Sequence, residues 1–456
     1  MCIRHKLAKR AFTFLACLIL LSAPVLSVSA EPSVTSDSVQ ETPVIALPEV
    51  PSLLSDAAIV INAKTGAVLY EKNSHGIYHP ASCTKIMTAL LTLENGVLSD
   101  TVTMSHNAIW GIDRDSSHIA LDVDEEISVN DLLHGLLIAS GNECAMGLAE
   151  YTSAKCGGNG TVEDFVDRMN RRAVELGAQN THFVNPHGLY DDAHVTTPYD
   201  LAQIMRYCIQ NQTFVSISGT THYTVYTNYA PSGRPFSHSN KLLTRGSYHN
   251  EDVICGKTGY TKDSGGSLVS YASRDGMELI TVTMGTTALK NSFEDTTALL
   301  NFCFENYSQV VPTAANKALA SLTLSSGVDA TVYSDVPENV ILPKGLSFAD
   351  LTPQSTVYAS LSLPLAAGTP VGTVRWYYLD KEFASATLYT STEVLPPVPE
   401  EETKDTPLFF RILLIAALVL IGIIVLFFIA AFINRSIRRA KRRRRKRVHQ
   451  KGNIFR

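Results

Sequence analysis

Three short segments place serine, lysine and amide side chains in a fixed order along the chain: Ser82-Cys83-Thr84-Lys85, Ser140-Gly141-Asn142 and Lys257-Thr258-Gly259. A serine hydroxyl is a weak nucleophile at neutral pH and needs an adjacent base. A lysine amine supplies that base when its pKa is lowered by burial or by a second cation. The three segments together therefore predict a site that transfers an acyl group through a serine ester.

The order and spacing of the segments carry this prediction, because two of the patterns are not unique. S-x-x-K occurs once, whereas K-T-G recurs at Lys64-Thr65-Gly66 and S-x-N recurs at Ser105-His106-Asn107 and Ser128-Val129-Asn130. The first K-T-G lies between the alternating runs 57–62 and 67–71, which predicts a hairpin turn. The segment Ser128-Val129-Asn130 is explained as a helix cap, with Asn130 as the expected N-cap. Taken singly, each motif is typical of an ordinary turn or helix start.

In the first segment, Ser82 is the predicted nucleophile and Lys85 its base. A helix is expected to start here, and residues three apart share one face of a helix. The backbone N–H groups of that helix end would lie near a developing oxyanion. Lys257 is the candidate second cation that lowers the pKa of Lys85.

The other two segments supply proton transfer and substrate contacts. Ser140 lies between two helical runs and could relay a proton, while the Asn142 amide could hold the lysine and a substrate carbonyl. Lys257 and Thr258, on the edge of a predicted strand, suit a substrate carboxylate. Gly259 would let one backbone approach another closely.

The periodicity predicts two folded parts in addition to terminal segments. Residues 53–307 mix strand and helix patterns, with N-caps expected at Asn130, Thr161 and Thr197 and a strand pair around Arg274-Asp275-Gly276. Residues 308–395 hold short β-prone runs broken by Gly, Pro and Asp and are expected to form a small all-β domain. These runs are Thr331–Tyr333, Val357–Leu363 and Thr373–Tyr378.

The ends of the chain indicate export and membrane attachment. Residues 1–30 are typical of a signal peptide, 31–52 of a linker, and 396–408 of an acidic, proline-bearing stalk. Residues 409–433 are long and apolar enough for a transmembrane helix, and the tail 434–456 is basic. The positive-inside rule then predicts a single-pass protein of the cell membrane, with its catalytic domain extracytoplasmic and its C-terminus cytoplasmic.

Charge and cysteine content narrow the function classes. The chain has 38 Lys and Arg and 43 Asp and Glu. The signal, Arg411 and the tail hold 17 of the basic residues and no acidic residue, which leaves 21 basic against 43 acidic residues in the exported part. The exported part is therefore strongly acidic and has no electrostatic case for binding nucleic acid. Six cysteines follow the signal, too few for a dense disulfide framework. Buried packing thiols are the favoured interpretation, with a disulfide or a cysteine nucleophile as the alternatives.

With these motifs, the chain resembles the serine penicillin-recognising enzymes, whose signature is S-x-x-K, S-x-N and K-T-G. It is most similar to the low-molecular-mass penicillin-binding proteins, the D-alanyl-D-alanine carboxypeptidases. The similarity is carried by 80–87 (PASCTKIM), 185–189 (NPHGL), 200–202 (DLA), 240–243 (NKLL) and 256–261 (GKTGYT). It implies an α/β (α+β) catalytic domain in which helices flank an antiparallel sheet, followed by the small all-β domain.

The resemblance also implies a reaction and its partners. Ser82 would be acylated by the penultimate D-alanine of a peptidoglycan stem peptide, with Lys85 as base, Ser140 as relay and Asn142 as positioning residue. Lys257 and Thr258 would bind the terminal carboxylate, and the N–H groups of Ser82 and Tyr260 would form the oxyanion hole. β-Lactams would acylate the same serine. The resemblance implies no cofactor and no metal.

Two departures and three rival interpretations accompany this prediction. Many relatives end in an amphipathic helix rather than a membrane span, and Cys83 beside the nucleophile suggests a site sensitive to oxidation. The rivals are a β-lactamase, a penicillin-acylated sensor and an inactive structural anchor. The tail after the span is too short to fold as a signalling domain, which disfavours the sensor.

Overall fold

The structure is a computed structural model that describes residues 45–113, 115–312, 320–335, 339–397 and 408–451. It divides into two units, residues 1–50 and 51–456, and every helix and strand named below belongs to the second. The predicted signal peptide, most of the predicted linker and most of the predicted stalk lie outside the described residues. The predicted domain boundaries remain predictions.

A five-stranded antiparallel sheet in the order β2-β1-β9-β8-β7 forms the centre of the larger folded part. Its strands are β1 (Ala57–Asn62), β2 (Val68–Lys72), β7 (Val253–Thr261), β8 (Gly265–Arg274) and β9 (Met277–Thr286). The first K-T-G forms the β1–β2 turn, as predicted, and the strand pair around residue 275 is confirmed as β8–β9. β7, which carries the second K-T-G, is an edge strand.

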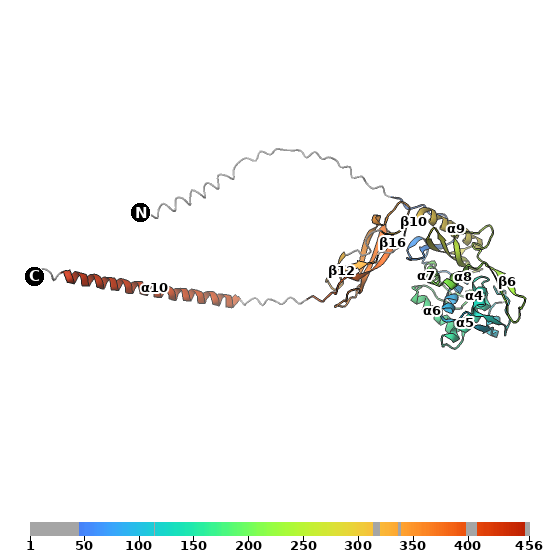
Figure 1. The fold of residues 1–456 in the computed structure, drawn as a ribbon, viewed down its shortest axis with the longest axis horizontal. Helices are drawn as coiled ribbons and strands as arrows, with labels where there is room; N and C mark the ends of the chain where they lie inside the picture. The colour runs from blue at the N-terminus through green and yellow to red at the C-terminus, as the bar shows by residue number, and fades with distance from the viewer. Residues whose placement is uncertain (1–44, 114, 313–319, 336–338, 398–407, 452–456) are drawn as a thin grey trace, which may run out of the picture. The chain divides into compact units, whose positions relative to one another are not determined.

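Helices cover the sheet on both sides (Figure 1). α9 packs against β8 and β9, whereas α7 packs against β1 and β9 and α8 packs against β7. The helices are α2 (Lys85–Asn95), α3 (His106–Trp110), α4 (Val129–Leu137), α5 (Asn142–Lys155), α6 (Val162–Glu175), α7 (Pro198–Cys208), α8 (Gln212–Gly219) and α9 (Leu289–Asn306). The short pairs β3 (Thr101–Thr103) with β4 (Glu126–Ser128) and β5 (His222–Val225) with β6 (Arg234–Ser237) complete this part.

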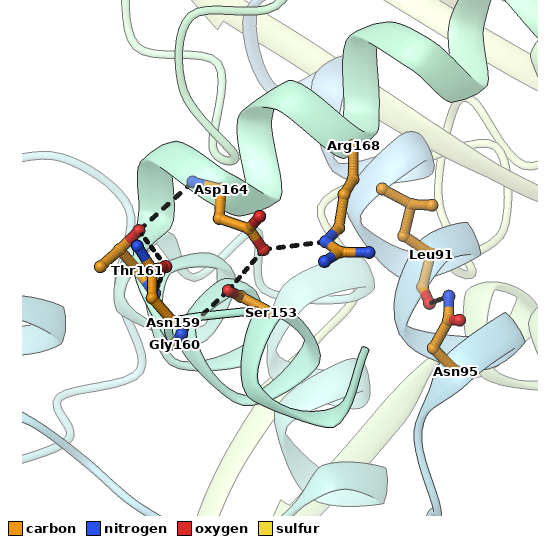
Figure 2. A network of polar contacts seen from close by, with 8 residues as sticks. All are labelled: Leu91, Asn95, Ser153, Asn159, Gly160, Thr161, Asp164 and Arg168. Carbon is orange, nitrogen blue, oxygen red and sulfur yellow. Dashed lines mark hydrogen bonds and ion pairs between the residues drawn. The ribbon is translucent and has the colours of Figure 1, made fainter. Parts of the chain in front are cut away.

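Local capping chemistry starts several of these helices where the sequence predicts. The Thr161 side chain accepts from the N–H of Asp164 at the start of α6, and the Asp164 carboxylate binds Ser153 and Arg168 (Figure 2). Thr197 caps α7 in the same way. The cap expected at Asn130 is wrong: Ser128 caps α4, because its hydroxyl accepts from the N–H of Asp131.

A second five-stranded antiparallel sheet follows α9, in the order β11-β12-β16-β15-β14. The all-β composition of this segment fits the predicted small domain. Its strands are β11 (Ala320–Thr323), β12 (Asp329–Ser334), β14 (Thr352–Val357), β15 (Pro370–Tyr378) and β16 (Lys381–Thr390), and a separate pair joins β10 (Tyr307–Val310) to β13 (Val340–Pro343). The strand expected over 357–363 is wrong, because pairing with β15 ends at Val357.

The last described element is α10 (Leu408–Lys451), a single helix of 44 residues. Its stretch Leu408–Arg443 is long and apolar enough to cross a membrane, with a mean hydropathy of 3.5 in its most apolar window. The apolar side chains of this stretch are exposed. The predicted membrane helix is therefore present as a helix, and the helix continues into the basic tail.

Candidate active site

The predicted nucleophile lies in a tight turn directly before a helix. Ala81–Thr84 form a 3-10 helix (η1), and α2 begins at Lys85 rather than at the serine. Side chains three residues apart eclipse one another in a 3-10 helix, so the predicted serine–lysine alignment holds although the local helix type differs. Ala81, immediately before Ser82, has a φ of 46°. Such a backbone conformation is costly for a non-glycine residue and recurs at functional sites.

Lys85 is the centre of the site. Its Nζ lies 3.0 Å from Ser82 Oγ, 2.6 Å from Asn142 Oδ1 and 2.6 Å from the carbonyl oxygen of His187. The side chain is fully buried. Burial, aided by the nearby charge of Lys257, holds the pKa of Lys85 well below its usual value. The amine can therefore exist unprotonated beside the serine hydroxyl.

The second lysine approaches from β7. Lys257 Nζ donates to Ser140 Oγ at 3.0 Å and to the carbonyl oxygen of Thr258 at 2.8 Å. Burial lowers the pKa of Lys257 to about 8. The Thr258 hydroxyl lies 2.8 Å from Ser239 Oγ. Lysine and threonine of the K-T-G segment thus contact serines from two other parts of the chain.

Residues of the S-G-N segment form hydrogen bonds with both lysines. Ser140 has a φ of 64° in the turn between α4 and α5. Asn142 begins α5, and its Nδ2 donates to Ser116 Oγ at 2.7 Å while its backbone N–H donates to the carbonyl of Ser117 at 2.9 Å. These bonds fix the amide so that its oxygen points at Lys85. The loop that holds Ser116 has no motif, and sequence reasoning missed it.

The N-P-H-G-L loop supplies the third acceptor of Lys85, a role that the sequence did not reveal. Asn185 Oδ1 accepts from the Gly188 N–H at 2.6 Å, and Thr88 Oγ1 donates to the Pro186 carbonyl at 2.6 Å, which ties the loop to α2. A Cβ on Gly188 would lie 1.9 Å from the Ala81 carbonyl oxygen. The absence of a side chain at this glycine lets the loop reach the nucleophile turn.

A buried histidine also supports that turn. The Thr84 hydroxyl donates to the Ala81 carbonyl at 2.8 Å and lies 2.8 Å from His194 Nε2. Since the single hydroxyl proton is used at Ala81, His194 Nε2 must be the donor to Thr84. His194 Nδ1 consistently accepts from the Val184 N–H at 3.0 Å. The imidazole is therefore held neutral in one tautomer.

Gly259 of the K-T-G segment also lets β7 approach the turn that carries Ser82. A Cβ on Gly259 would lie 2.7 Å from the Pro80 carbonyl oxygen and 3.2 Å from the Cys83 N. The predicted close approach at this glycine is thus confirmed. Tyr260 is half exposed at the next position of β7.

The six cysteines among the described residues are free thiols, and five of them are buried, which agrees with the packing interpretation. Cys83 is fully buried, and burial raises its pKa to about 12. The thiolate is the reactive form of cysteine. The structure therefore argues against the oxidation sensitivity expected from the position of Cys83 beside the nucleophile.

The predicted residues of the three motifs thus meet in one place, around two buried lysines. A serine hydroxyl beside a lysine of lowered pKa, with a second lysine and a threonine hydroxyl nearby, defines a serine acyl-transfer site of the penicillin-recognising type. Residues 45–288 match the family model described as D-alanyl-D-alanine carboxypeptidase. The chain belongs to this family and is a serine hydrolase.

Individual relatives agree with this assignment. The chain is 31% identical over 330 residues to D-alanyl-D-alanine carboxypeptidase DacF of Bacillus subtilis, covering 70% of this chain and 80% of the relative. It is similar in structure to penicillin binding protein 5 of Haemophilus influenzae, with 26% identity and a TM-score of 0.61 over 77% of this chain and 100% of that one. The Streptomyces K15 DD-transpeptidase matches with 29% identity and a TM-score of 0.51 over 57% and 100%.

These findings confirm the fold class and the carboxypeptidase prediction. They do not support the β-lactamase or the sensor.

Proposed function

We propose that this carboxypeptidase removes the terminal D-alanine of peptidoglycan stem peptides through an acyl-enzyme on Ser82. The observation that carries the proposal is the buried Lys85, whose Nζ lies 3.0 Å from Ser82 Oγ and whose pKa is lowered. A neutral amine has two N–H bonds and one lone pair. Asn142 Oδ1 and the His187 carbonyl accept the two N–H bonds, so the lone pair is left for the serine proton.

The reaction then follows in two steps. Ser82 Oγ attacks the carbonyl of the penultimate D-alanine while its proton passes to Lys85, and the D-Ala–D-Ala amide bond breaks. Ser140 relays this proton from Lys85 to the departing amine, and its hydroxyl oxygen accepts from Lys257 Nζ at 3.0 Å. Water next attacks the ester and restores the serine, which completes the hydrolysis.

Substrate recognition falls to the edge strand. Lys257 and Thr258 bind the terminal carboxylate, and the N–H groups of Ser82 and Tyr260 bind the oxyanion. Gly259 allows the close contact of strand and turn on which this arrangement depends. β-Lactams acylate the same serine in this scheme. The segment 409–433 anchors the enzyme in the cell membrane, with the catalytic domain extracytoplasmic and the basic C-terminus cytoplasmic.

Release of D-alanine from an N-acylated peptide ending in D-Ala-D-Ala tests the proposal. The detergent-solubilised full chain is expected to release one D-alanine per peptide. A peptide ending in D-Ala-L-Ala serves as the control and should be cleaved far more slowly. No release from the first peptide would contradict the proposed function.

The two lysines predict a bell-shaped pH profile of kcat/KM. Activity should rise with pH as Lys85 loses its proton and becomes a base, and fall as pH passes about 8, where Lys257 loses the charge that binds the carboxylate. Lys257→Arg keeps a positive charge to higher pH, so its alkaline limb should move upward relative to the native enzyme. An alkaline limb that stays in place would assign the descending limb to another group.

A further inference from the structure

A basic cleft adjoins the K-T-G strand and has no role in the chemistry above. It has a volume of about 670 Å³ and is formed by the β5–β6 hairpin and the segment that leads into β7. Its lining residues are Thr221, His222, Ser237, Lys241, Leu243, Thr244, Arg245 and His249. The lining therefore includes a lysine, an arginine and two histidines and lacks any acidic side chain.

The two cations of the cleft are available to a ligand. In the part of the chain that the structure describes, neither Lys241 nor Arg245 forms an ion pair, whereas Arg168, Arg172 and Arg274 each do. Lys241 and Arg245 are also both exposed. The exported part of the chain is strongly acidic overall. These two unpaired cations therefore form a locally positive site on a negatively charged protein.

The backbone places this cleft beside the predicted carboxylate site. His238 and Asn240 are fully buried, whereas Ser237 and Lys241 are exposed and Ser239 is half-buried. Ser239 Oγ lies 2.8 Å from Thr258 Oγ1. Ser237 and Lys241 are each two residues from Ser239, a separation of at most about 7 Å between Cα atoms.

Buried side chains on both sides of Ser239 make hydrogen bonds within the fold. His238 Nε2 lies 3.0 Å from the Ser218 carbonyl oxygen, and Asn240 Oδ1 accepts from the Leu242 N–H at 3.0 Å. Both side chains are fully buried, and the contact of His238 joins this segment to the end of α8. The volume of the cleft lies within the range of about 300–1,000 Å³ that is usual for ligand sites, and its polar, basic lining suits an anionic ligand.

We propose that this basic cleft is a leaving-group subsite for an acidic residue. The enzyme would then also cleave bonds of the form acyl-D-Ala–X, where X is a D-amino acid that is larger than alanine and carries a second carboxylate. This inference rests on the proposed function, because it places the first carboxylate of X at Lys257 and Thr258. The second carboxylate lies in the cleft with Lys241 and Arg245.

The chemistry of cleavage is unchanged by the larger leaving group. Ser82 Oγ forms the ester with the D-Ala carbonyl, the amide bond to X breaks, and X leaves as an amine with the proton that Lys85 took. Water then hydrolyses the ester. Only the contacts made by X differ, so the subsite affects which substrates are cleaved and leaves the bond-breaking steps the same.

A charge series at X tests the subsite with the full chain. Three peptides share one acyl-D-Ala part and end in D-Ala, D-Glu or D-Gln, and kcat/KM is measured for release of each terminal residue. Because D-Glu and D-Gln have the same shape, their ratio reports the charge alone. We expect the native enzyme to prefer D-Glu by about three- to tenfold at low salt, as two exposed cations would provide, and to lose this preference at high salt.

Two double variants then test which basic residues cause the preference for D-Glu. Lys241→Gln combined with Arg245→Gln should bring the D-Glu to D-Gln ratio close to one. Lys290→Gln combined with Arg171→Gln removes the same charge from exposed positions outside the cleft lining and should leave the ratio unchanged.

A native ratio near one, or a ratio that the Lys241 and Arg245 changes do not alter, would overturn the subsite while D-Ala release still supports the proposed function. Absence of D-Ala release from the peptide ending in D-Ala-D-Ala would contradict the proposed function itself.

Discussion

Lys85→Gln is expected to slow acylation about 10³-fold or more, since general-base catalysis contributes factors of about 10² to 10⁴. Glutamine still offers N–H donors to the oxygens that Lys85 contacts, Asn142 Oδ1 and the His187 carbonyl. It has no basic lone pair for the proton of Ser82. The rate is measured as covalent labelling by a fluorescent penicillin under conditions in which labelling follows the acylation step.

The duplicate K-T-G supplies the control for this experiment. Lys64→Gln changes a lysine in the β1–β2 turn whose Nζ pairs with Glu278 at 2.9 Å on the surface. It should label at the native rate. Thermal unfolding of both variants shows whether the fold is intact. Labelling of a folded Lys85→Gln protein at the native rate would mean that another group accepts the serine proton.

Gly188→Ala is expected to destabilise the protein by about 3 kcal/mol and to lower activity about 10²-fold. The φ of Gly188 is 87°, and a Cβ there would lie 1.9 Å from the Ala81 carbonyl oxygen. Positive φ costs an L-residue about 1–2 kcal/mol, and overpacking adds about 1–3 kcal/mol. Because Ala81 precedes Ser82, the displaced turn carries the nucleophile with it, and a shift of about 1 Å can cost about 10²-fold in rate.

Gly177→Ala separates the two contributions. Gly177 has a φ of 82°, and a Cβ there would have nothing within 4 Å. This control should lose only the backbone contribution, about 1–2 kcal/mol, and keep full activity. Stability is measured by urea denaturation and activity by D-alanine release. Equal effects of the two alanines would show that the contact with Ala81 does not hold the turn.

The parts of the site that the sequence predicts are those fixed by local chemistry. Ser82 and Lys85 are three residues apart in one turn, and any helical geometry there brings their side chains together. Thr161 and Thr197 start helices because their side chains accept from nearby backbone N–H groups. The β1–β2 turn at Lys64-Thr65-Gly66 likewise depends on adjacent residues.

The parts that the sequence does not predict depend on contacts between distant segments. Ser116 orients Asn142 from a loop without a motif, and the carbonyl of His187 binds Lys85 across 102 positions. Every residue has a main-chain carbonyl, so the sequence of side chains does not show which carbonyl acts as the acceptor. The cleft beside Thr258 is another example. Lys241 and Arg245 line it, and their proximity to the K-T-G segment follows only from the contact between Ser239 and Thr258 in the folded chain.

The ends of strands are predicted wrongly for the same reason. The run 357–363 has β-prone residues, but β14 ends at Val357, where its pairing with β15 stops. Strand propensity describes a fit to neighbouring strands more than a property of the backbone. The neighbours are known only in the folded sheet.

The most direct test of the central claim is to trap the acyl-enzyme during D-alanine release and to locate it in the chain. A reaction with an N-acylated peptide ending in D-Ala-D-Ala is quenched in acid, digested and analysed by mass spectrometry, beside the Ser82→Ala variant. We expect an adduct on the fragment that contains Ser82, with the mass of the acyl part without its terminal D-alanine, and neither adduct nor release in the variant. Release of D-alanine by Ser82→Ala at the native rate, or an adduct on another residue, would contradict the account.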